Sequence, residues 1–212
     1  MEITWYGQSC FRLTERGSAS VVTDPFDHKV AGYSALKLKS DIVTVSHEAP
    51  GHNFLEAVKA YKHLLDGPGE YEIGGVFITA VRTNGKKKDD QPRNTLYVFD
   101  YDGLSVAHLG DLREVPTRSQ VDALGEVNIA LVPVGDGGGL SAAKAAEAIG
   151  VLDPNIVVPM HYATPDSKLS FDPLDKFIKQ MGLGIIESET SLKITKGSLP
   201  EDTRVMVLEY QK

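Results

Sequence analysis

The chain has 212 residues, enough for one domain with a substantial core, and its apolar share of 42% and charged share of 24% are ordinary for a globular protein. A net charge of -7 argues against a nucleic-acid or membrane-surface partner, because such binding depends on clustered Lys and Arg. The single cysteine, Cys10, excludes an intramolecular disulfide, and no stretch resembles a signal peptide or a membrane span. These features predict a cytoplasmic protein.

The first forty residues are rich in short β-branched runs. They predict strands at Glu2–Tyr6, Ser9–Thr14 and Ser20–Thr23, and the third ends at Asp24-Pro25. An Asp before Pro is common where a strand ends in a turn. His28 follows in a polar loop, where we expect it to be solvated.

The most informative stretch of the sequence is 41–53. An apolar, β-branched run that begins at Asp41 predicts a buried strand, which the Pro50-Gly51 pair ends. His47 and His52 therefore lie where a rigid strand opens onto a loop, and they are the first candidates for a metal or acid/base site. Two histidines in a turn are also common as ordinary polar loop residues.

The rest of the first half predicts one short helix and more strands. Asn53 can cap a helix over Phe54–Tyr61, a strand is expected at His63–Asp66, and Glu70–Arg82 contains a turn at Gly74-Gly75. The charge run from Lys86 to Asp90 predicts a solvated loop, although three lysines near a pocket can also attract an anionic ligand.

The second half alternates strands with helices, and its strands end in polar residues. A hairpin across Asp102-Gly103 ends at Asp111, and a later strand ends at His161. A glycine loop at 135–139 precedes a helix; it is read as a connection, with phosphate binding as the alternative. The predicted helices are Thr117–Leu124, Ser141–Leu152 and Phe171–Met181, and the predicted strands are Asn94–Tyr101, Leu104–Leu109, Asn128–Val134, Asn155–Pro159, Leu183–Glu187, Leu192–Thr195 and Arg204–Tyr210.

Several motifs resemble, in order, those of the metallo-β-lactamase superfamily. "VTVSHEAPGHN" (43–53) resembles its His-x-His-x-Asp-His loop, and "TWYGQSCFRL" (4–13) resembles its opening "GHSCF", which "TDP" (23–25) follows. Stretches 67–78, 94–112 and 157–162 resemble small hydrolases that include the ascorbate-6-phosphate lactonases. The resemblance implies one α/β domain over 1–212, an αβ/βα sandwich in which two mixed β-sheets pack face to face with helices outside. It also implies that Asp24 supports the histidine loop.

The chain departs from the family at its metal ligands. Ala49 and Gly51 stand where the family has His and Asp, and Gln8 replaces the opening His. A further family histidine, expected near residues 84–85, is also absent. Loss of several ligands together indicates loss of two-metal chemistry.

Four candidate site residues remain, namely His47, His52, Asp111 and His161. By the resemblance, His47 stands alone in one metal position, while His52, Asp111 and His161 remain at the other. Two imidazoles and a carboxylate match catalytic zinc sites that keep an open place for water, with Asp111 and His161 as catalytic residues.

Two functions remain open from the sequence. The first is a degenerate relative that is non-catalytic, or that binds a small-molecule ligand, with no metal. The second is a hydrolase of a small ester, lactone or phosphoester with one Zn or Mn ion. Without a metal, Asp111 is expected to pair with His52 or His161.

Overall fold

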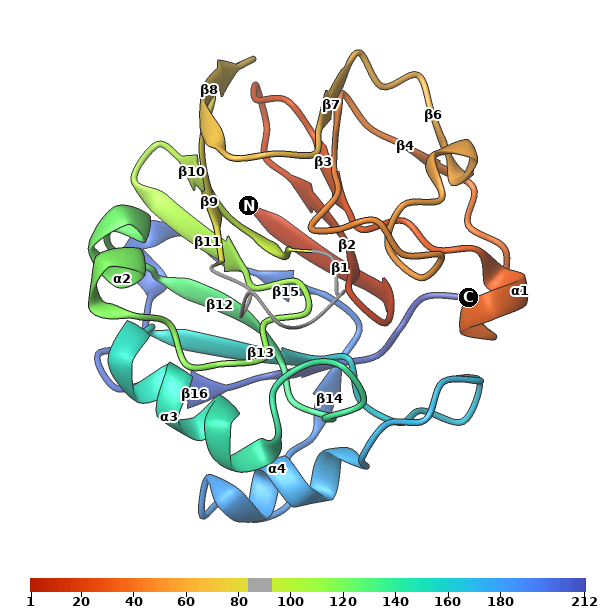
Figure 1. The fold of residues 1–212 in the computed structure, drawn as a ribbon. Coiled ribbons are helices and arrows are strands. Elements are labelled where there is room, and N and C mark those ends of the chain that lie inside the picture. Colours follow the sequence, from red (N-terminus) through yellow and green to blue (C-terminus); the bar gives the residue numbers. More distant parts are fainter. Residues whose placement is uncertain (84–92) are drawn as a thin grey trace.

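Two β-sheets packed face to face form the body of the protein (Figure 1). The structure is a computed structural model, and it describes residues 1–83 and 93–212. The first sheet has the order β15 (Leu192–Lys193), β1 (Glu2–Gly7), β2 (Cys10–Thr14), β3 (Val21–Thr23), β5 (Ile42–Thr44) and β7 (His63–Leu65). The second sheet has the order β16 (Arg204–Val205), β13 (Ile156–Met160), β12 (Ile129–Pro133), β11 (Leu104–His108), β10 (Thr95–Tyr101), β9 (Val76–Arg82) and β8 (Gly69–Ile73). Both sheets are mixed, because each has parallel and antiparallel pairs.

Short helices lie outside the sheets. Figure 1 shows α3 (Ala142–Leu152) and α4 (Leu174–Gln180) on the outer side of the second sheet, and α1 (His28–Ala31) beside the first. The remaining elements are α2 (Arg118–Leu124), η1 (Leu55–Ala57), η2 (Lys196–Ser198) and two small pairs, β4 (Leu38–Lys39) with β6 (Val58–Lys59) and β14 (Ser188–Glu189) with β17 (Val207–Leu208). This arrangement confirms the predicted sandwich. None of the helices in the described ranges is long and apolar enough to cross a membrane.

The alternation of side chains along the first sheet gives it two buried faces. Phe11 and Val21 point into the main core between the sheets, whereas their neighbours Cys10 and Val22 point into a second, smaller core. The smaller core lies under α1 and the β4–β6 pair, with Phe26 among its buried residues. The first sheet is therefore held rigid from both sides.

The parallel strands of both sheets end at one edge of the sandwich. Within the first sheet β3 runs parallel to β5, and within the second sheet β11, β12 and β13 run parallel. Ligand sites of α/β proteins form where the carboxyl ends of parallel strands open onto loops. This topology brings together the polar residues that follow four strands, although these residues are far apart in the sequence.

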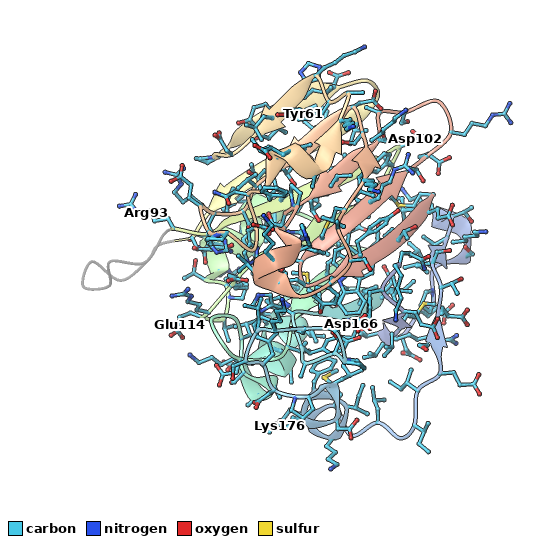
Figure 2. All side chains as sticks on the ribbon, turned by 90° about the vertical axis from the view of Figure 1, so that its right-hand side faces the viewer. Tyr61, Arg93, Asp102, Glu114, Asp166 and Lys176 are labelled. Carbon is cyan, nitrogen blue, oxygen red and sulfur yellow. The ribbon has the colours of Figure 1, made fainter. Side chains whose placement is uncertain are left out.

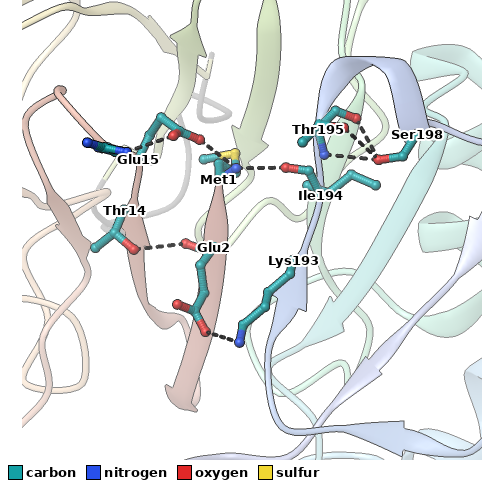
Figure 3. A pocket seen from close by; sticks show the side chains of 9 residues that line it. Met1, Glu2, Thr14, Glu15, Lys193, Ile194, Thr195 and Ser198 are labelled. Carbon is teal, nitrogen blue, oxygen red and sulfur yellow. Dashed lines mark hydrogen bonds and ion pairs between the residues drawn. The ribbon is translucent and has the colours of Figure 1, made fainter.

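The opposite end of the first sheet carries a surface groove without histidines or a carboxylate cluster (Figure 3). Here the Met1 amine donates to Ile194 O at 2.7 Å and contacts Glu15, so it joins β1 to the chain beyond β15. Glu2 contacts Lys193 across the same seam at 3.8 Å. These contacts close the edge of the sheet.

Most predicted elements are confirmed within two or three residues, and one predicted helix is wrong. Helices α2 and α3 lie where they were predicted, with Thr117 and Ser141 as their N-caps, and Asp102-Gly103 turns the β10–β11 hairpin. Phe54–Tyr61 is instead the single turn η1 followed by β6, which pairs with β4. A short, weakly amphipathic segment gains little as an isolated helix, so burial of Val58 in the smaller core as a strand residue decides its conformation.

The last predicted strands are also corrected. Leu183–Glu187 forms no strand; pairing begins at Ser188, where β14 meets β17. Arg204–Tyr210 is split, because β16 joins the second sheet and β17 pairs with β14. His28 is the first residue of α1 rather than a loop residue. Strands this short are decided by available partners, which the sequence pattern does not show.

Candidate metal centre

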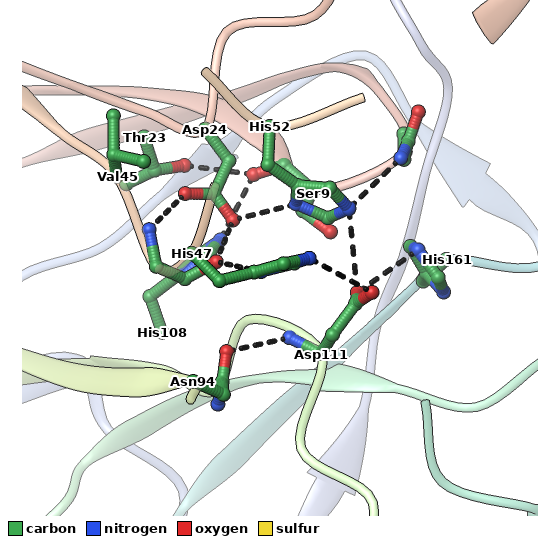
Figure 4. A network of polar contacts seen from close by, with 12 residues as sticks. Ser9, Thr23, Asp24, Val45, His47, His52, Asn94, His108, Asp111 and His161 are labelled. Atoms are coloured by element: carbon green, nitrogen blue, oxygen red, sulfur yellow. Dashed lines mark hydrogen bonds and ion pairs between the residues drawn. The ribbon is translucent and has the colours of Figure 1, made fainter. Parts of the chain in front are cut away.

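Four strand ends supply the polar side chains that meet at this edge (Figure 4). Asp24 follows β3, His47 follows β5, Asp111 follows β11 and His161 follows β13. His52 returns from the turn after His47. All five are buried, with exposed fractions of 8% or less. The fold therefore brings together all four candidate residues predicted from the sequence, and it places Asp24 beside them, where the resemblance implies a supporting role.

Asp24 is the hub of the buried hydrogen bonds (Figure 4). Its Oδ1 accepts from the Ser46 amide at 2.7 Å, and its Oδ2 accepts from Ser46 Oγ at 2.6 Å and His52 Nδ1 at 2.9 Å. Burial alone would raise the pKa of Asp24, but the His52 hydrogen bond and nearby histidines lower that pKa to about 2. Asp24 is thus an ionised acceptor that supports the histidine loop.

The proton positions of two histidines follow from these contacts. Because an ionised carboxylate can only accept, His52 carries a proton on Nδ1, and its Nε2 faces the site as the atom that can bind a metal ion. Ser46 uses its only hydroxyl hydrogen on Asp24, so at 3.0 Å Ser46 Oγ accepts from His47 Nδ1. The His47 Nε2 lone pair therefore also faces inward. Asp24 sets both tautomers, one directly and one through Ser46.

The Asp111 carboxylate lies between the imidazoles. Its Oδ2 is 3.4 Å from His47 Nε2, and its Oδ1 is 3.4 Å from His52 Nε2 and 3.0 Å from His161 Nε2. Oδ1 is buried and has no hydrogen bond of acceptable geometry. The ligand atoms of His47, His52 and Asp111 all lie within 4.8 Å of one another, a spacing that fits one divalent ion, whereas His161 contacts the carboxylate from outside this compact group.

The electrostatics of the cluster favour a cation at its centre. Burial lowers the pKa of His47 and lowers that of His161 to about 4, so both imidazoles are neutral at pH 7. His52 differs: burial opposes protonation, but Asp111 and Asp24 raise its pKa. Burial would raise the pKa of Asp111, yet the surrounding histidines lower it, so the carboxylate is ionised. The donor set is two neutral imidazoles, the His52 imidazole, which a metal ion would have to deprotonate at Nε2, and one negative charge.

Asn94 and Gly110 hold Asp111 in position. The Asn94 amide donates to Leu109 O and accepts from the Asp111 backbone N–H, both at 2.9 Å. Gly110 has φ +53°, and a Cβ there would lie 2.6 Å from Ser46 Cβ. Only glycine allows the Asp111 turn to approach the histidine loop this closely.

His108 supports the site from the core. Its Nε2 lies 2.8 Å from Ser9 O, and the side chain is fully buried. Burial lowers its pKa, so His108 is a neutral donor to that carbonyl. Cys10 is buried in the smaller core.

Arg113 was not predicted as functional, and the glycine loop at 135–139 was read as a connection with phosphate binding as the alternative. Arg113 Nε donates to Gly138 O at 2.6 Å. A Cβ added to Gly138 would lie 3.7 Å from Asp111 Oδ2 and 3.9 Å from Arg113 Nη2, so Gly138 lies between these two side chains. The glycine loop thus lies beside the cluster and holds the Arg113 guanidinium through the Gly138 carbonyl. Next to Arg113, Glu114 lies on the same side of the molecule as Arg93 (Figure 2).

Gln8 was read from the sequence only as a lost histidine, but its side chain enters the cluster. Its Nε2 lies 3.0 Å from His52 Nε2, and the residue is 2% exposed. Gln8 and Gly51 both depart from the family pattern, and this pair of departures was the signal in the sequence that could have linked the two positions. The lysines at 86–88, expected to be solvated or to attract an anion, lie outside the described residues.

Comparison with known proteins assigns the class. The model of the beta-lactamase superfamily domain matches residues 2–161, and the chain belongs to this superfamily. A crystal structure of a metallo-β-lactamase superfamily protein from Thermotoga maritima is 33% identical, with a TM-score of 0.80 over 99% of both chains.

Named relatives agree with that class. A metal-dependent hydrolase of Natranaerobius thermophilus is 26% identical over 77% of this chain and 84% of its own. One from Archaeoglobus fulgidus is 25% identical over 87% of this chain and 94% of its own. The resemblance to ascorbate-6-phosphate lactonases stays a prediction.

Proposed function

We propose that the protein is a metal-dependent hydrolase that holds one divalent ion, zinc or manganese, on His47, His52 and Asp111, with His161 beside the carboxylate as the next candidate ligand. One observation carries the proposal: the Nε2 atoms of His47, His52 and His161 all face the Asp111 carboxylate, and Asp24 and Ser46 orient the first two rings. In a buried site that carboxylate needs a positive partner, which is a proton on His52 or a metal ion that replaces it. A divalent ion there supplies Lewis-acid activation of water and of the substrate's polar oxygen.

The chain's own residues would orient the reaction. Asp24 and Ser46 keep the imidazoles in the ligand tautomer, and Asp111, ionised and buried, can accept a proton from the attacking water. Arg113 offers a positive charge beside Asp111, which suits an ester, lactone or phosphoester with an anionic group. These roles support the second of the two functions left open by the sequence.

A metal-free ligand-binding protein is the second candidate. It is favoured by the Gln8 amide, which lies against His52 Nε2, and by the missing ligands at Ala49 and Gly51. In that case the pocket would bind a small molecule without turnover.

Metal content and turnover separate the two functions. Purified protein is equilibrated with zinc or manganese, freed of unbound ions, analysed by mass spectrometry and assayed with nitrophenyl esters, lactones and phosphodiesters. We expect about one ion per chain and hydrolysis that is lost on chelation and in Asp111→Asn and His161→Ala. His63→Ala, an exposed histidine on β7, is the control. Parent protein that retains no ion would refute the hydrolase proposal.

A further inference from the structure

Gln8 and Gly51 share one space beside His52. A Cβ added to Gly51 would lie 2.4 Å from Gln8 Nε2 and 3.3 Å from Gln8 Oε1, so the amide fills the volume that a side chain at position 51 would need. Both positions border His52, whose Nε2 lies 3.0 Å from Gln8 Nε2. The space beside His52 therefore holds one polar side chain, which either position 8 or position 51 could supply.

The backbone holds Gln8 firmly in this place. Its carbonyl accepts from Trp5 Nε1 at 3.0 Å and from the His161 amide at 3.3 Å. Gln8 has φ +49° and His161 has φ +57°, conformations that side-chain-bearing residues rarely adopt. Such strain persists only where surrounding contacts over-determine the geometry, and it clusters at functional sites.

The Gln8 amide has one atom in use and one unpartnered. Nε2 can donate to the His52 Nε2 lone pair, while Oε1 is buried without a hydrogen bond. When an ion takes that lone pair, the N–H loses its acceptor. A half turn of the terminal amide then exchanges the two atoms, and brings Oε1 to the distance from His52 Nε2 that two ligands of one ion have.

We propose that Gln8 supplies an amide-oxygen ligand to the metal ion, in place of the carboxylate that Gly51 lacks. The inference rests on the proposed metal site and adds to it a ligand from β1–β2, a part of the chain outside the four candidates. An amide oxygen is neutral, so a divalent ion with Asp111 and the ionised Asp24 behind His52 leaves the loaded site without net charge. The nearby Arg113 is then the positive charge that an anionic substrate group would meet.

Metal affinity tests the ligand role without reference to activity. Zinc affinity is measured by chelator competition for the parent, Gln8→Met, which keeps volume but removes both polar atoms, and Gln8→Glu. We expect at least a tenfold loss in Gln8→Met and a gain in Gln8→Glu, with visible absorption of the cobalt(II) complex changed in Gln8→Met. Gln180→Met, on the exposed end of α4, should match the parent in both measurements.

If Gln8 is not a ligand, the change in zinc affinity should have the opposite sign. If Gln8 only covers the His52 lone pair, Gln8→Met binds zinc as tightly as the parent or more tightly, with an unchanged cobalt spectrum, and the inference is overturned. If the parent binds no zinc, the proposed function itself fails. A second test moves the ligand: Gly51→Asp alone should destabilise by collision with Gln8, whereas Gln8→Ala with Gly51→Asp should recover the affinity lost in Gln8→Ala.

Discussion

The change from Asp24 to Asn tests whether one buried carboxylate sets the protonation of two metal ligands. Asn fits the backbone, because it tolerates the φ of +38° at this position. Its oxygen can keep the Ser46 amide, but its NH2 replaces the oxygen that accepts from Ser46 Oγ and His52 Nδ1. The NH2 group of the new Asn would then face the Ser46 hydroxyl and His52 Nδ1–H, which are both donors in the parent protein.

The network can relax in only one direction. With the amide N–H as donor, His52 Nδ1 becomes an acceptor, and Ser46 Oγ accepts from the amide and donates to His47 Nδ1. Both imidazoles then carry their proton on Nε2, directed at Asp111. The inward lone pairs that hold the ion are lost together.

The magnitudes follow from the bonds exchanged. Hydrogen bonds to a charged group contribute about 1.5–3 kcal/mol each, and new Nε2–H contacts to Asp111 offset part of the loss, so we expect the metal-free variant to lose about 2–3 kcal/mol in free energy of unfolding. Loss of a supporting carboxylate lowers metal affinity roughly 10–100-fold, and since Asp24 acts on two ligands we expect the upper end, about 2.7 kcal/mol.

Two measurements check this prediction. Chelator competition gives the zinc affinity, and ¹⁵N chemical shifts of the imidazoles report which nitrogen carries the proton. Asp41→Asn is a matched control, because Asp41 also accepts from the amide and hydroxyl of one serine, Ser20, but at the opposite end of β5. Zinc affinity equal to that of the parent, with both histidines still protonated on Nδ1, would refute the tautomer argument.

Two further predictions concern the sheets and the substrate. Tyr97 Oη lies 3.0 Å from Val45 O and 2.9 Å from Leu65 O, across the two sheets, so Tyr97→Phe should cost about 1–2 kcal/mol and lower the melting midpoint by about 2–8 °C. An unchanged midpoint in calorimetry would count against that bridge. Arg113→Gln should raise KM for a phosphodiester at least tenfold and leave zinc affinity and KM for an uncharged ester unchanged, in contrast to the exposed Arg118→Gln. Equal loss on both substrates would remove Arg113 from substrate binding.

The sequence by itself determined the strands and the residues at their ends. Apolar β-branched runs are local patterns, and a polar residue at the exit of a buried strand stands out in them. His47, Asp111 and His161 were found this way, and the family motifs aligned them with His52. The same patterns failed at Phe54–Tyr61, where pairing with β4 outweighs a weak helical preference.

Only the tertiary structure decided how these side chains act on one another. The proton positions of His47 and His52 depend on Asp24 and Ser46, and hydrogen bonds between separate strand exits leave no periodic signal in the sequence. Gln8 is a second example. In the sequence it only marks the absence of the family histidine, whereas in the structure its side chain fills the volume beside His52 that Gly51 leaves open. Distance along the chain carries no information on such contacts, because close packing brings residues 43 positions apart into one volume.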